Sequence, residues 1–309
     1  MTWWLLAGAL LGGLGISAVA VAMSIRLAHR FDVLDYPDSE RKTQEQPIPK
    51  LGGLAVAVAF AVVVTIAMQF VALPGEGQLA AAALVPAVFA GVVGYIDDRV
   101  HINPYVRLTL QALTGILVWL LGTRVGLFQI EWLDAIVVVA FVVILINGLN
   151  LLDNSDGLAA STTVIAALGA AVIAVIYEQE LVSLLGFALV GITLGFLWHN
   201  WFPARVYLGD SGAYFLATLL AVAVIRLRPE DIPPSSGVVI ALLLIALPLV
   251  DTTYVAVKRL SAGIHPFTAG RDHLSHAIQE RGMSVPASVM TLQILSLLGA
   301  LGAVTIASI

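Results

Sequence analysis

The chain has 309 residues, of which 60% are hydrophobic and only 11% are charged, with a formal net charge of −5 and a mean hydropathy of +0.97. A soluble domain carries about 25% charged residues, so the composition excludes a soluble protein and predicts one polytopic membrane domain over residues 1–309. The chain contains no cysteine, which excludes disulfides, thiolate catalysis and cysteine-bound metal.

Apolar runs long enough to cross a bilayer recur along the whole sequence. About 17–25 residues are needed for one helical span, and helices are expected because an open strand edge is not stable in lipid. The sequence predicts an all-α integral membrane protein with about ten transmembrane helices around a cytoplasm-facing active-site cleft. The predicted spans are 3–27, 51–73, 79–96, 105–121, 131–147, 157–177, 181–198, 211–227, 237–257 and 287–308.

Basic residues divide the connecting loops into two sets. Twelve of the fifteen Lys and Arg lie in or beside the loops after the odd-numbered spans, and three lie on the opposite side. The positive-inside rule places the first set in the cytoplasm and both termini outside. The three exceptions are Arg124, Arg226 and Arg228.

A pair of adjacent carboxylates, Asp97 and Asp98, lies at the end of the third predicted span. Adjacent carboxylates repel each other and need cations, a metal or a proton to coexist. The pair is interpreted either as a structural ion pair with Arg99 and Arg107 or as part of a functional site.

Four polar side chains recur at every third position at the end of the fifth span, namely Asn147, Asn150, Asp153 and Asp156. A charged group at membrane depth costs about 2.5–3.5 kcal/mol on insertion scales and usually faces a cavity or a partner. Residues three apart are displaced by about 60° around a helix, so one continuous helix cannot direct all four at a single point. We expect the helix to end near 153–155 and a new one to begin with Asp156 as N-cap.

Two further segments carry polar residues on the same side of the membrane. Asp210, at the start of the eighth span, could cap that helix or bind a metal, and Tyr207 is either an interfacial aromatic or a platform for a flat ring. In the segment 265–276, His273 and His276 are helical neighbours and are expected to converge with Arg271 on a metal or on phosphate oxygens. Asp251 is expected to face the same cavity.

These side chains suit phosphoryl transfer. Asp and Asn oxygens without a thiolate favour Mg²⁺ over Zn²⁺, and Arg and His on a facing loop suit the neutralisation of a diphosphate. Catalysis of phosphoryl transfer is mainly positioning and charge stabilisation.

Taken together, the segments resemble the polyprenyl-phosphate N-acetylhexosamine-1-phosphate transferase family, in particular its bacterial branch that makes undecaprenyl-diphosphate-N-acetylglucosamine. The resemblance covers nearly the whole chain and its motifs occur in the family's order. They are Arg-Lys at 41–42, Pro-x-Pro-x-x-Gly-Gly at 47–53, Asp-Asp at 97–98, Asn-x-x-Asn-x-x-Asp-x-x-Asp-Gly-Leu-Ala at 147–159, Asn-x-x-Pro-Ala at 200–204, Gly-Asp-Ser-Gly at 209–212, Pro-Phe at 266–267 and Arg-x-His-x-x-His at 271–276.

The resemblance implies an activity and its partners. A UDP-N-acetylhexosamine, expected to be UDP-GlcNAc, donates sugar-1-phosphate to undecaprenyl phosphate and releases UMP, as the first step of a cell-envelope polysaccharide such as lipopolysaccharide or teichoic acid. Mg²⁺ is the implied cofactor, with Mn²⁺ as a substitute. The implied location is the bacterial cytoplasmic membrane with the active site on the cytoplasmic side; a homodimer is compatible with the resemblance, and no nucleic-acid partner is expected.

The resemblance also implies roles for individual residues. The metal ligands are Asp210 and Asn150, and the catalytic carboxylates are Asp97, which binds or deprotonates the lipid phosphate, with Asp98, Asp153 and Asp156. The implied nucleotide-binding residues are Lys42, Asn154, Ser155, Asp156, Asn200 and Tyr207. The implied diphosphate- and sugar-binding residues are Arg107, Arg271, His273 and His276.

Three positions depart from the family pattern. Thr43-Gln44 stands where a histidine often follows Arg-Lys, Asn154 stands where glycine is usual, and Ser275 stands where a further histidine is usual. These departures leave the sugar preference open.

Two alternatives remain at the level of the sequence. The same reaction could use UDP-MurNAc-pentapeptide, as in the synthesis of the first lipid-linked peptidoglycan precursor. An ion-coupled transporter could instead use Asp97, Asp153 and Asp251 to bind its ion, but such sites usually lie near the midplane within internal repeats.

Overall fold

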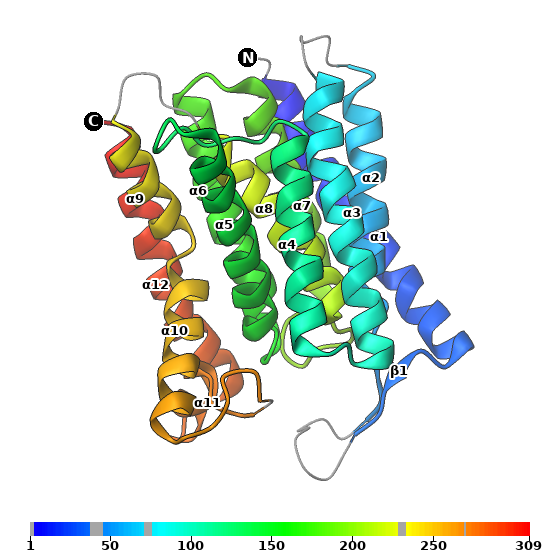
Figure 1. Ribbon diagram of the computed structural model, residues 1–309. Coiled ribbons are helices and arrows are strands. Elements are labelled where there is room, and N and C mark those ends of the chain that lie inside the picture. Colours follow the sequence, from blue (N-terminus) through cyan, green and yellow to red (C-terminus); the bar gives the residue numbers. More distant parts are fainter. Residues whose placement is uncertain (1–2, 38–45, 71–75, 228–232, 269) are drawn as a thin grey trace.

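The computed structural model describes residues 3–37, 46–70, 76–227, 233–268 and 270–309, so Lys42 lies outside the described residues. Within these ranges the chain forms a bundle of twelve α-helices with one small two-stranded sheet (Figure 1). The elements are α1 (Trp3–Phe31), β1 (Leu34–Asp35), β2 (Ile48–Pro49), α2 (Gly52–Ala67), α3 (Glu76–Val100), α4 (Pro104–Leu120), α5 (Glu131–Leu152), α6 (Leu158–Ile176), α7 (Glu180–Asn200), α8 (Gly209–Ile225), α9 (Pro234–Leu244), α10 (Ala246–Ser261), α11 (Leu274–Gln279) and α12 (Val285–Ala307).

Each apolar run identified in the sequence contains helix in the part of the chain that the structure describes. Among the described residues, six helices are long and apolar enough to cross a membrane, or seven if the bent pair α9 and α10 is one span, while α2 and α8 are shorter apolar helices. The chain is therefore a multi-pass membrane protein. Several helices extend past the predicted bounds; α5, for example, continues from 147 to Leu152.

The ninth predicted span is not one straight helix. α9 and α10 meet at Ile245 with a bend of 72°. Pro248 lies in the first turn of α10, where a proline is tolerated because the N–H that it lacks has no partner inside the helix. An unbroken helix would need that N–H to donate to Leu244, so the expectation of a single continuous helix over 237–257 was wrong.

The expectation of an all-α chain also needs a small correction. Leu34 and Asp35 pair antiparallel with Ile48 and Pro49 in strands of two residues each. These strands lie in the connection between α1 and α2, outside the apolar runs, where water can satisfy their open edges. Their effect is to bring the start of α2 back to the end of α1.

Helix α8 is the centre of the bundle. Each of its residues from Ser211 to Val224 is buried, and it packs against helices on all sides, most extensively α3 and α5. A helix that is apolar all round belongs in the interior of a bundle. The first turn of α8 is therefore the most enclosed support that the chain offers to a functional side chain.

Glycines allow neighbouring backbones to come close to that first turn. A Cβ at Gly94 in α3 would overlap the carbonyl oxygen of Asp210, and a Cβ at Gly53 in α2 would overlap the backbone of Gly212. The Gly53 N–H also donates to the Leu208 carbonyl at 3.1 Å. Small residues at helix contacts permit such approach in membrane bundles, and here they bring α2 and α3 against the start of α8.

This packing gives a testable prediction. Gly94→Ala is expected to lower the free energy of unfolding by about 1–3 kcal/mol, because overpacking forces a backbone shift. Gly8→Ala in α1 is the matched control, since nothing lies within 4 Å of a Cβ there. Thermal unfolding in detergent compares the two variants, and equal midpoints for both would contradict the proposed role of this contact.

Candidate active site

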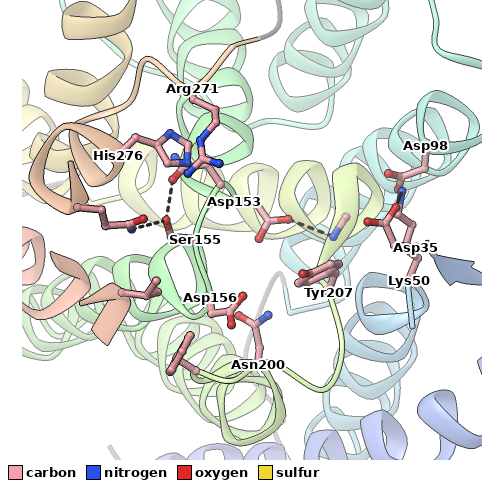
Figure 2. Close-up of a pocket in the computed structure, with 15 residues that line it drawn as sticks. Asp35, Lys50, Asp98, Asp153, Ser155, Asp156, Asn200, Tyr207, Arg271 and His276 are labelled. Atoms are coloured by element: carbon pink, nitrogen blue, oxygen red, sulfur yellow. Dashed lines mark hydrogen bonds and ion pairs between the residues drawn. The ribbon is translucent and has the colours of Figure 1, made fainter. Parts of the chain in front are cut away.

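A cavity of about 330 Å³ opens at the end of the bundle where α11 lies, opposite the end that holds both chain termini (Figure 1). Its walls come from segments far apart in the sequence. In Figure 2, Arg271 and His276 lie on one side of the cavity, Asp98, Asp35 and Lys50 lie on the other, and Asp153 lies between them. The lining residues are Asp35, Lys50, Asp98, Asp153, Asn154, Ser155, Asp156, Asn200, Phe202, Tyr207, Gly209, Arg271, His276, Gln279 and Val285.

The helix break predicted after the fifth span is confirmed. α5 ends at Leu152 and α6 begins at Leu158. Gly157 adopts a φ of +76°, a left-handed conformation that glycine reaches at little cost. Asp153 and Asp156 thus leave the helix and line the cavity, whereas Asn147 and Asn150 stay within α5.

The expectation that Asp156 caps α6 was wrong. The N-cap position belongs to Gly157, which has no side chain. The Asp156 carboxylate instead accepts a hydrogen bond of 2.9 Å from the Ala204 N–H in the loop between α7 and α8. Asp156 therefore joins the break to that loop.

Two carboxylates of the cavity are fixed by the first turn of α8. Asp153 accepts from the Gly209 N–H at 3.2 Å, and Asp98 accepts from the Ser211 N–H at 3.3 Å. Backbone N–H groups at a helix start attract negative charge. Burial raises the pKa of Asp153 well above its usual range, and the negative charges of Asp210 and Asp98 raise it further. The cavity thus gathers several acidic side chains, and their repulsion favours the protonated form of Asp153.

Asn150 and Asp210, the two residues expected to bind metal, contact each other beside the cavity. The Asn150 amide donates to the Asp210 carboxylate at 2.5 Å. In the described part of the chain, no group of three or more His, Cys, Asp or Glu is arranged to hold a metal ion. Mg²⁺ commonly uses only one or two carboxylates, with waters and substrate phosphates completing its shell. The oxygen donors of Asp210, Asn150 and the neighbouring Asp153 fit that requirement.

Asp97 points away from the cavity, unlike its neighbour. It is 4% exposed and accepts from the Ile102 N–H at 2.8 Å, from Tyr214 Oη at 3.1 Å and from Arg107 at 3.4 Å. The structure thus brings Asp98 to the cavity and places Asp97 and Arg107 behind it. Asp97 therefore forms the structural ion pair with Arg107, whereas Asp98 belongs to the candidate site.

The segment after α10 divides its residues in the same way. Arg271 and His276 line the cavity, but buried His273 contacts Asp251 through Nδ1 at 2.9 Å. Asp251 also accepts from the Leu274 N–H at 2.8 Å. The expectation that Asp251 faces the cavity was therefore wrong. The rings of His273 and His276 lie 5.5 Å apart between their centroids, and their convergence on a ligand stays a prediction. The buried Asp251 is satisfied by the start of α11 and holds that helix in place.

An ion pair between Arg259 and Asp272 supports the segment after α10. Arg259 in α10 donates to Asp272 at 3.0 Å and to the Pro266 carbonyl at 2.7 Å. The hydrogen bond from Arg259 lowers the pKa of Asp272 below its usual range. The carboxylate of Asp272 is therefore charged at neutral pH and fixes the end of the loop that carries Arg271.

His276 is a neutral imidazole at the cavity wall. Burial lowers its pKa to about 4, and the nearby charges of His273 and Arg271 act in the same direction. Its Nδ1 atom is buried without a hydrogen-bond partner among the described residues. A neutral ring of this kind can donate or accept one hydrogen bond to a bound ligand.

Tyr207 and Asn200, both expected to bind the nucleotide, have different surroundings. Tyr207 lines the cavity, and burial followed by the charge of Asp156 raises the pKa of its hydroxyl, which stays protonated. Asn200 lies in the lining but is 3% exposed. It accepts from the Gly157 N–H at 3.1 Å and donates to the Val206 carbonyl at 2.9 Å, so it joins the break at Gly157 to the loop before α8.

Three polar lining residues were missed at the level of the sequence. Lys50 lies within the Pro-x-Pro-x-x-Gly-Gly motif, so its position carried a usable signal. Asp35 pairs with Lys50 at 2.6 Å only because β1 and β2 bring the two together, and no motif marks it. Gln279 enters from α11 and is a polar residue without any pattern of its own.

Comparison with known proteins agrees with this site. The model for glycosyl transferase family 4 matches residues 80–228, which include the carboxylate pair, the helix break and the start of α8. A probable undecaprenyl-phosphate N-acetylglucosaminyl 1-phosphate transferase of Bacillus subtilis is 26% identical over 293 residues, which are 92% of this chain and 80% of that protein. A decaprenyl-phosphate N-acetylglucosaminephosphotransferase of Mycolicibacterium smegmatis is 28% identical over 302 residues, which are 85% of this chain and 73% of that protein.

A third relative has a different donor in its name. A phospho-N-acetylmuramoyl-pentapeptide-transferase of Heliobacterium modesticaldum is 32% identical over 214 residues, which are 62% of this chain and 64% of that protein. These matches identify the chain as a glycosyl-1-phosphate transferase. Over residues 80–228 it matches glycosyl transferase family 4, the polyprenyl-phosphate N-acetylhexosamine-1-phosphate transferases.

The hydrogen bonds of Asn200 give a prediction about stability. Asn200→Ala is expected to lower the free energy of unfolding by about 1–3 kcal/mol, because the buried Gly157 N–H and Val206 carbonyl lose their partner. Thermal unfolding without any ligand measures this loss. An Asn200→Ala variant with wild-type stability and weak nucleotide binding would show that Asn200 acts on the nucleotide alone.

The depressed pKa of His276 gives a prediction about pH. The unfolded histidine has a pKa of about 6.5, whereas the folded residue has a pKa of about 4. Between these values the unfolded chain binds a proton that the folded chain does not, so acidification favours unfolding. The unfolding midpoint of His276→Asn should therefore fall less between pH 7 and pH 5 than that of the wild type.

The control for this pH series is His29→Asn. His29 is exposed near the end of α1, so its replacement should leave the wild-type pH dependence intact. Equal pH dependence for all three proteins would contradict a neutral, buried His276.

Proposed function

We propose that the protein transfers N-acetylglucosamine-1-phosphate from UDP-GlcNAc to undecaprenyl phosphate, giving undecaprenyl-diphosphate-GlcNAc and UMP. The observation that carries this proposal is the cavity itself. Carboxylates on one side face Arg271 and the neutral His276 on the other. Such a division suits a diphosphate that is held by cationic and hydrogen-bonding groups next to a cation site.

The donor occupies the cavity with its uridine toward Tyr207 and its diphosphate toward Arg271. The Tyr207 ring provides an aromatic surface for uracil, and Asp156 lies beside it for the polar edge of the nucleoside. Arg271 forms charge-assisted hydrogen bonds to the diphosphate, and His276 adds one neutral hydrogen bond. Lys50, held by Asp35, supplies the other positive charge of the lining.

Asp210 and Asn150 are the residues that would hold Mg²⁺. When bound, the ion would neutralise charge on the diphosphate oxygens. The N–H groups of Gly209 and Ser211 keep Asp153 and Asp98 directed toward the same region, so that the carboxylates do not depend on the ion for their placement.

The reaction joins two phosphates at this point. An oxygen of the lipid phosphate attacks the sugar-side phosphorus of the UDP-sugar, the bond from that phosphorus to the bridging oxygen breaks, and UMP leaves with that oxygen. Asp98 is the carboxylate placed to orient the attacking phosphate or to take its proton. Asp97 holds Arg107 and Tyr214 behind Asp98 and acts as a positioning residue.

The same proposal includes the arrangement in the membrane. The helices account for about ten crossings when α2, α4, α8 and the bent pair of α9 and α10 are included, with the cavity on the cytoplasmic side and both termini outside. In this arrangement residues 1–309 act as one unit in a bacterial cytoplasmic membrane. A homodimer is compatible with it.

A second candidate donor is UDP-MurNAc-pentapeptide. The similarity to the phospho-N-acetylmuramoyl-pentapeptide-transferase favours it, since the cavity chemistry is the same for either sugar. The longer coverage of the two relatives named for N-acetylglucosamine favours UDP-GlcNAc.

A reconstituted assay tests the proposal. Purified protein with UDP-GlcNAc, undecaprenyl phosphate and Mg²⁺ is expected to release UMP, measured by chromatography of the nucleotides. The same panel with UDP-MurNAc-pentapeptide and other UDP-sugars identifies the donor. Release of UMP only from the pentapeptide donor would overturn the first choice and support the second.

Substitution of the candidate metal ligand provides a separate test. Asp210→Asn is expected to lower kcat by a factor of about 10²–10³, because it weakens the binding of the Mg²⁺ that would neutralise the reacting phosphates. Glu131→Gln is the matched carboxylate-to-amide control, since Glu131 is exposed at the far end of α5 and should keep wild-type turnover. An Asp210→Asn protein that folds normally and retains full activity contradicts the role of Asp210.

A further inference from the structure

Asn154 lies in the cavity wall, but its side chain is already engaged by the protein. Its amide nitrogen donates to the Leu151 carbonyl at 2.5 Å. Its oxygen accepts from the hydroxyls of Ser275 at 2.5 Å and Ser155 at 3.0 Å. An amide oxygen has two lone pairs, so the acceptor of Asn154 is fully used and is not free for a nucleobase.

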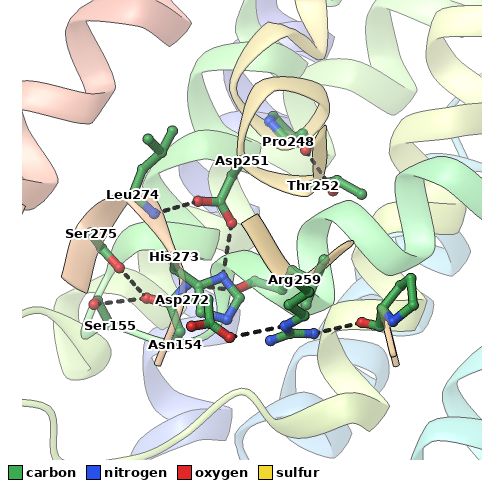
Figure 3. A network of polar contacts seen from close by, with 12 residues as sticks. Asn154, Ser155, Pro248, Asp251, Thr252, Arg259, Asp272, His273, Leu274 and Ser275 are labelled. Carbon is green, nitrogen blue, oxygen red and sulfur yellow. Dashed lines mark hydrogen bonds and ion pairs between the residues drawn. The ribbon is translucent and has the colours of Figure 1, made fainter. Parts of the chain in front are cut away.

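The contact with Ser275 joins two segments that are far apart in the sequence. Asn154 belongs to the break between α5 and α6, and Ser275 belongs to α11 (Figure 3). A second contact lies one turn further along α11, where Gln279 donates to Ser155 at 3.4 Å. Residues four apart lie on one face of a helix, so one face of α11 is attached to the break.

The start of α11 is attached to α10 and not to the helix break. Asp251 accepts from the Leu274 N–H and contacts His273, which fixes the start of α11 against α10 (Figure 3). The distance from α11 to the helix break is therefore set by Asn154 and Ser155. This distance matters because Arg271 and His276, on either side of this attachment, form the wall opposite the carboxylates.

We propose that Asn154 and Ser275 form a latch that positions Arg271 and His276 for the UDP-sugar donor. In this role Asn154 is a positioning residue and makes no contact with the nucleotide. The proposal rests on the proposed function only in that donor turnover is one of its readouts. Both latch residues are positions where the chain departs from the family pattern, and the structure brings the two departures into one hydrogen bond.

The burial of Ser275 explains why the two departures belong together. Ser275 is completely buried, so a histidine at this position would need space now filled by the Asn154 carboxamide. Glycine at 154 would release that space but leave the Ser275 hydroxyl without its partner. Each residue type is therefore suited to the other.

Steady-state kinetics tests the latch as a unit. Ser275→Ala and Asn154→Gly are each expected to raise the KM for the donor about tenfold, while the KM for the lipid phosphate stays unchanged. Because both changes remove one interaction, the double variant should also show about a tenfold effect, since contacting residues are not additive. Thr291→Ala, which removes an exposed hydroxyl from α12, is the control with wild-type constants.

Three kinetic outcomes would contradict the latch between Asn154 and Ser275. A hundredfold effect in the double variant, or wild-type donor KM in both single variants, overturns the latch. The exchange variant with Asn154→Gly and Ser275→His together is expected to recover donor KM relative to Ser275→His alone. Failure of that recovery also overturns the pairing of the two positions.

A chemical test does not depend on any activity. The chain has no cysteine, so Asn154→Cys with Ser275→Cys introduces a single pair, which should form a disulfide under mild copper–phenanthroline oxidation. Asn154→Cys with Thr291→Cys is the control pair and should not. Mass spectrometry of the linked peptides gives the result, and no link at 154 and 275 overturns the latch. Absence of UMP release by the wild-type protein overturns the proposed function alone.

Discussion

The close contact of three backbones at the start of α8 is the constraint on which the rest of the site depends. Gly53 and Gly94 let α2 and α3 reach the first turn of α8, where any Cβ would overlap the backbone. The N–H groups of that turn then hold Asp98 and Asp153, and Asp210 lies within it. Carboxylates repel one another in a site of low dielectric, so their proximity is maintained by the packing energy of buried helices and by backbone hydrogen bonds.

The helix break at Gly157 complements that packing. A continuous α5 would scatter its polar residues around the helix, whereas the turn of 153–157 presents them to three different partners. Asp153 meets α8, Asp156 meets the loop after α7, and Asn154 meets α11. The turn thus joins three walls of the cavity, and Asn200 fixes it from behind by accepting from Gly157.

Much of this architecture could be predicted from the sequence, for identifiable physical reasons. Apolar runs located the long helices but not α11 or the bend between α9 and α10, and the spacing of Asn150, Asp153 and Asp156 required a break. The direction of individual side chains was not predictable, because Asp97 and Asp98 are adjacent and both contact α8, yet only Asp98 lines the cavity. Asp251 shows the same limit: a carboxylate in an apolar run must be satisfied, but a helix N–H and a histidine satisfied it instead of the cavity. Asp35 depended on a two-residue strand pair that is too short to leave a pattern.

The two sides of the cavity differ in how firmly the fold holds them. One side is anchored to α8, which is surrounded by other helices and can exchange its amide hydrogens only when the bundle opens. The other side is α11, a helix of six residues attached mainly through side chains. Local opening of α11 is therefore expected to need less free energy than unfolding of the whole bundle. In the proposed function, a donor that bridges the two sides would add its binding energy to α11, while the carboxylate wall would stay fixed by α8.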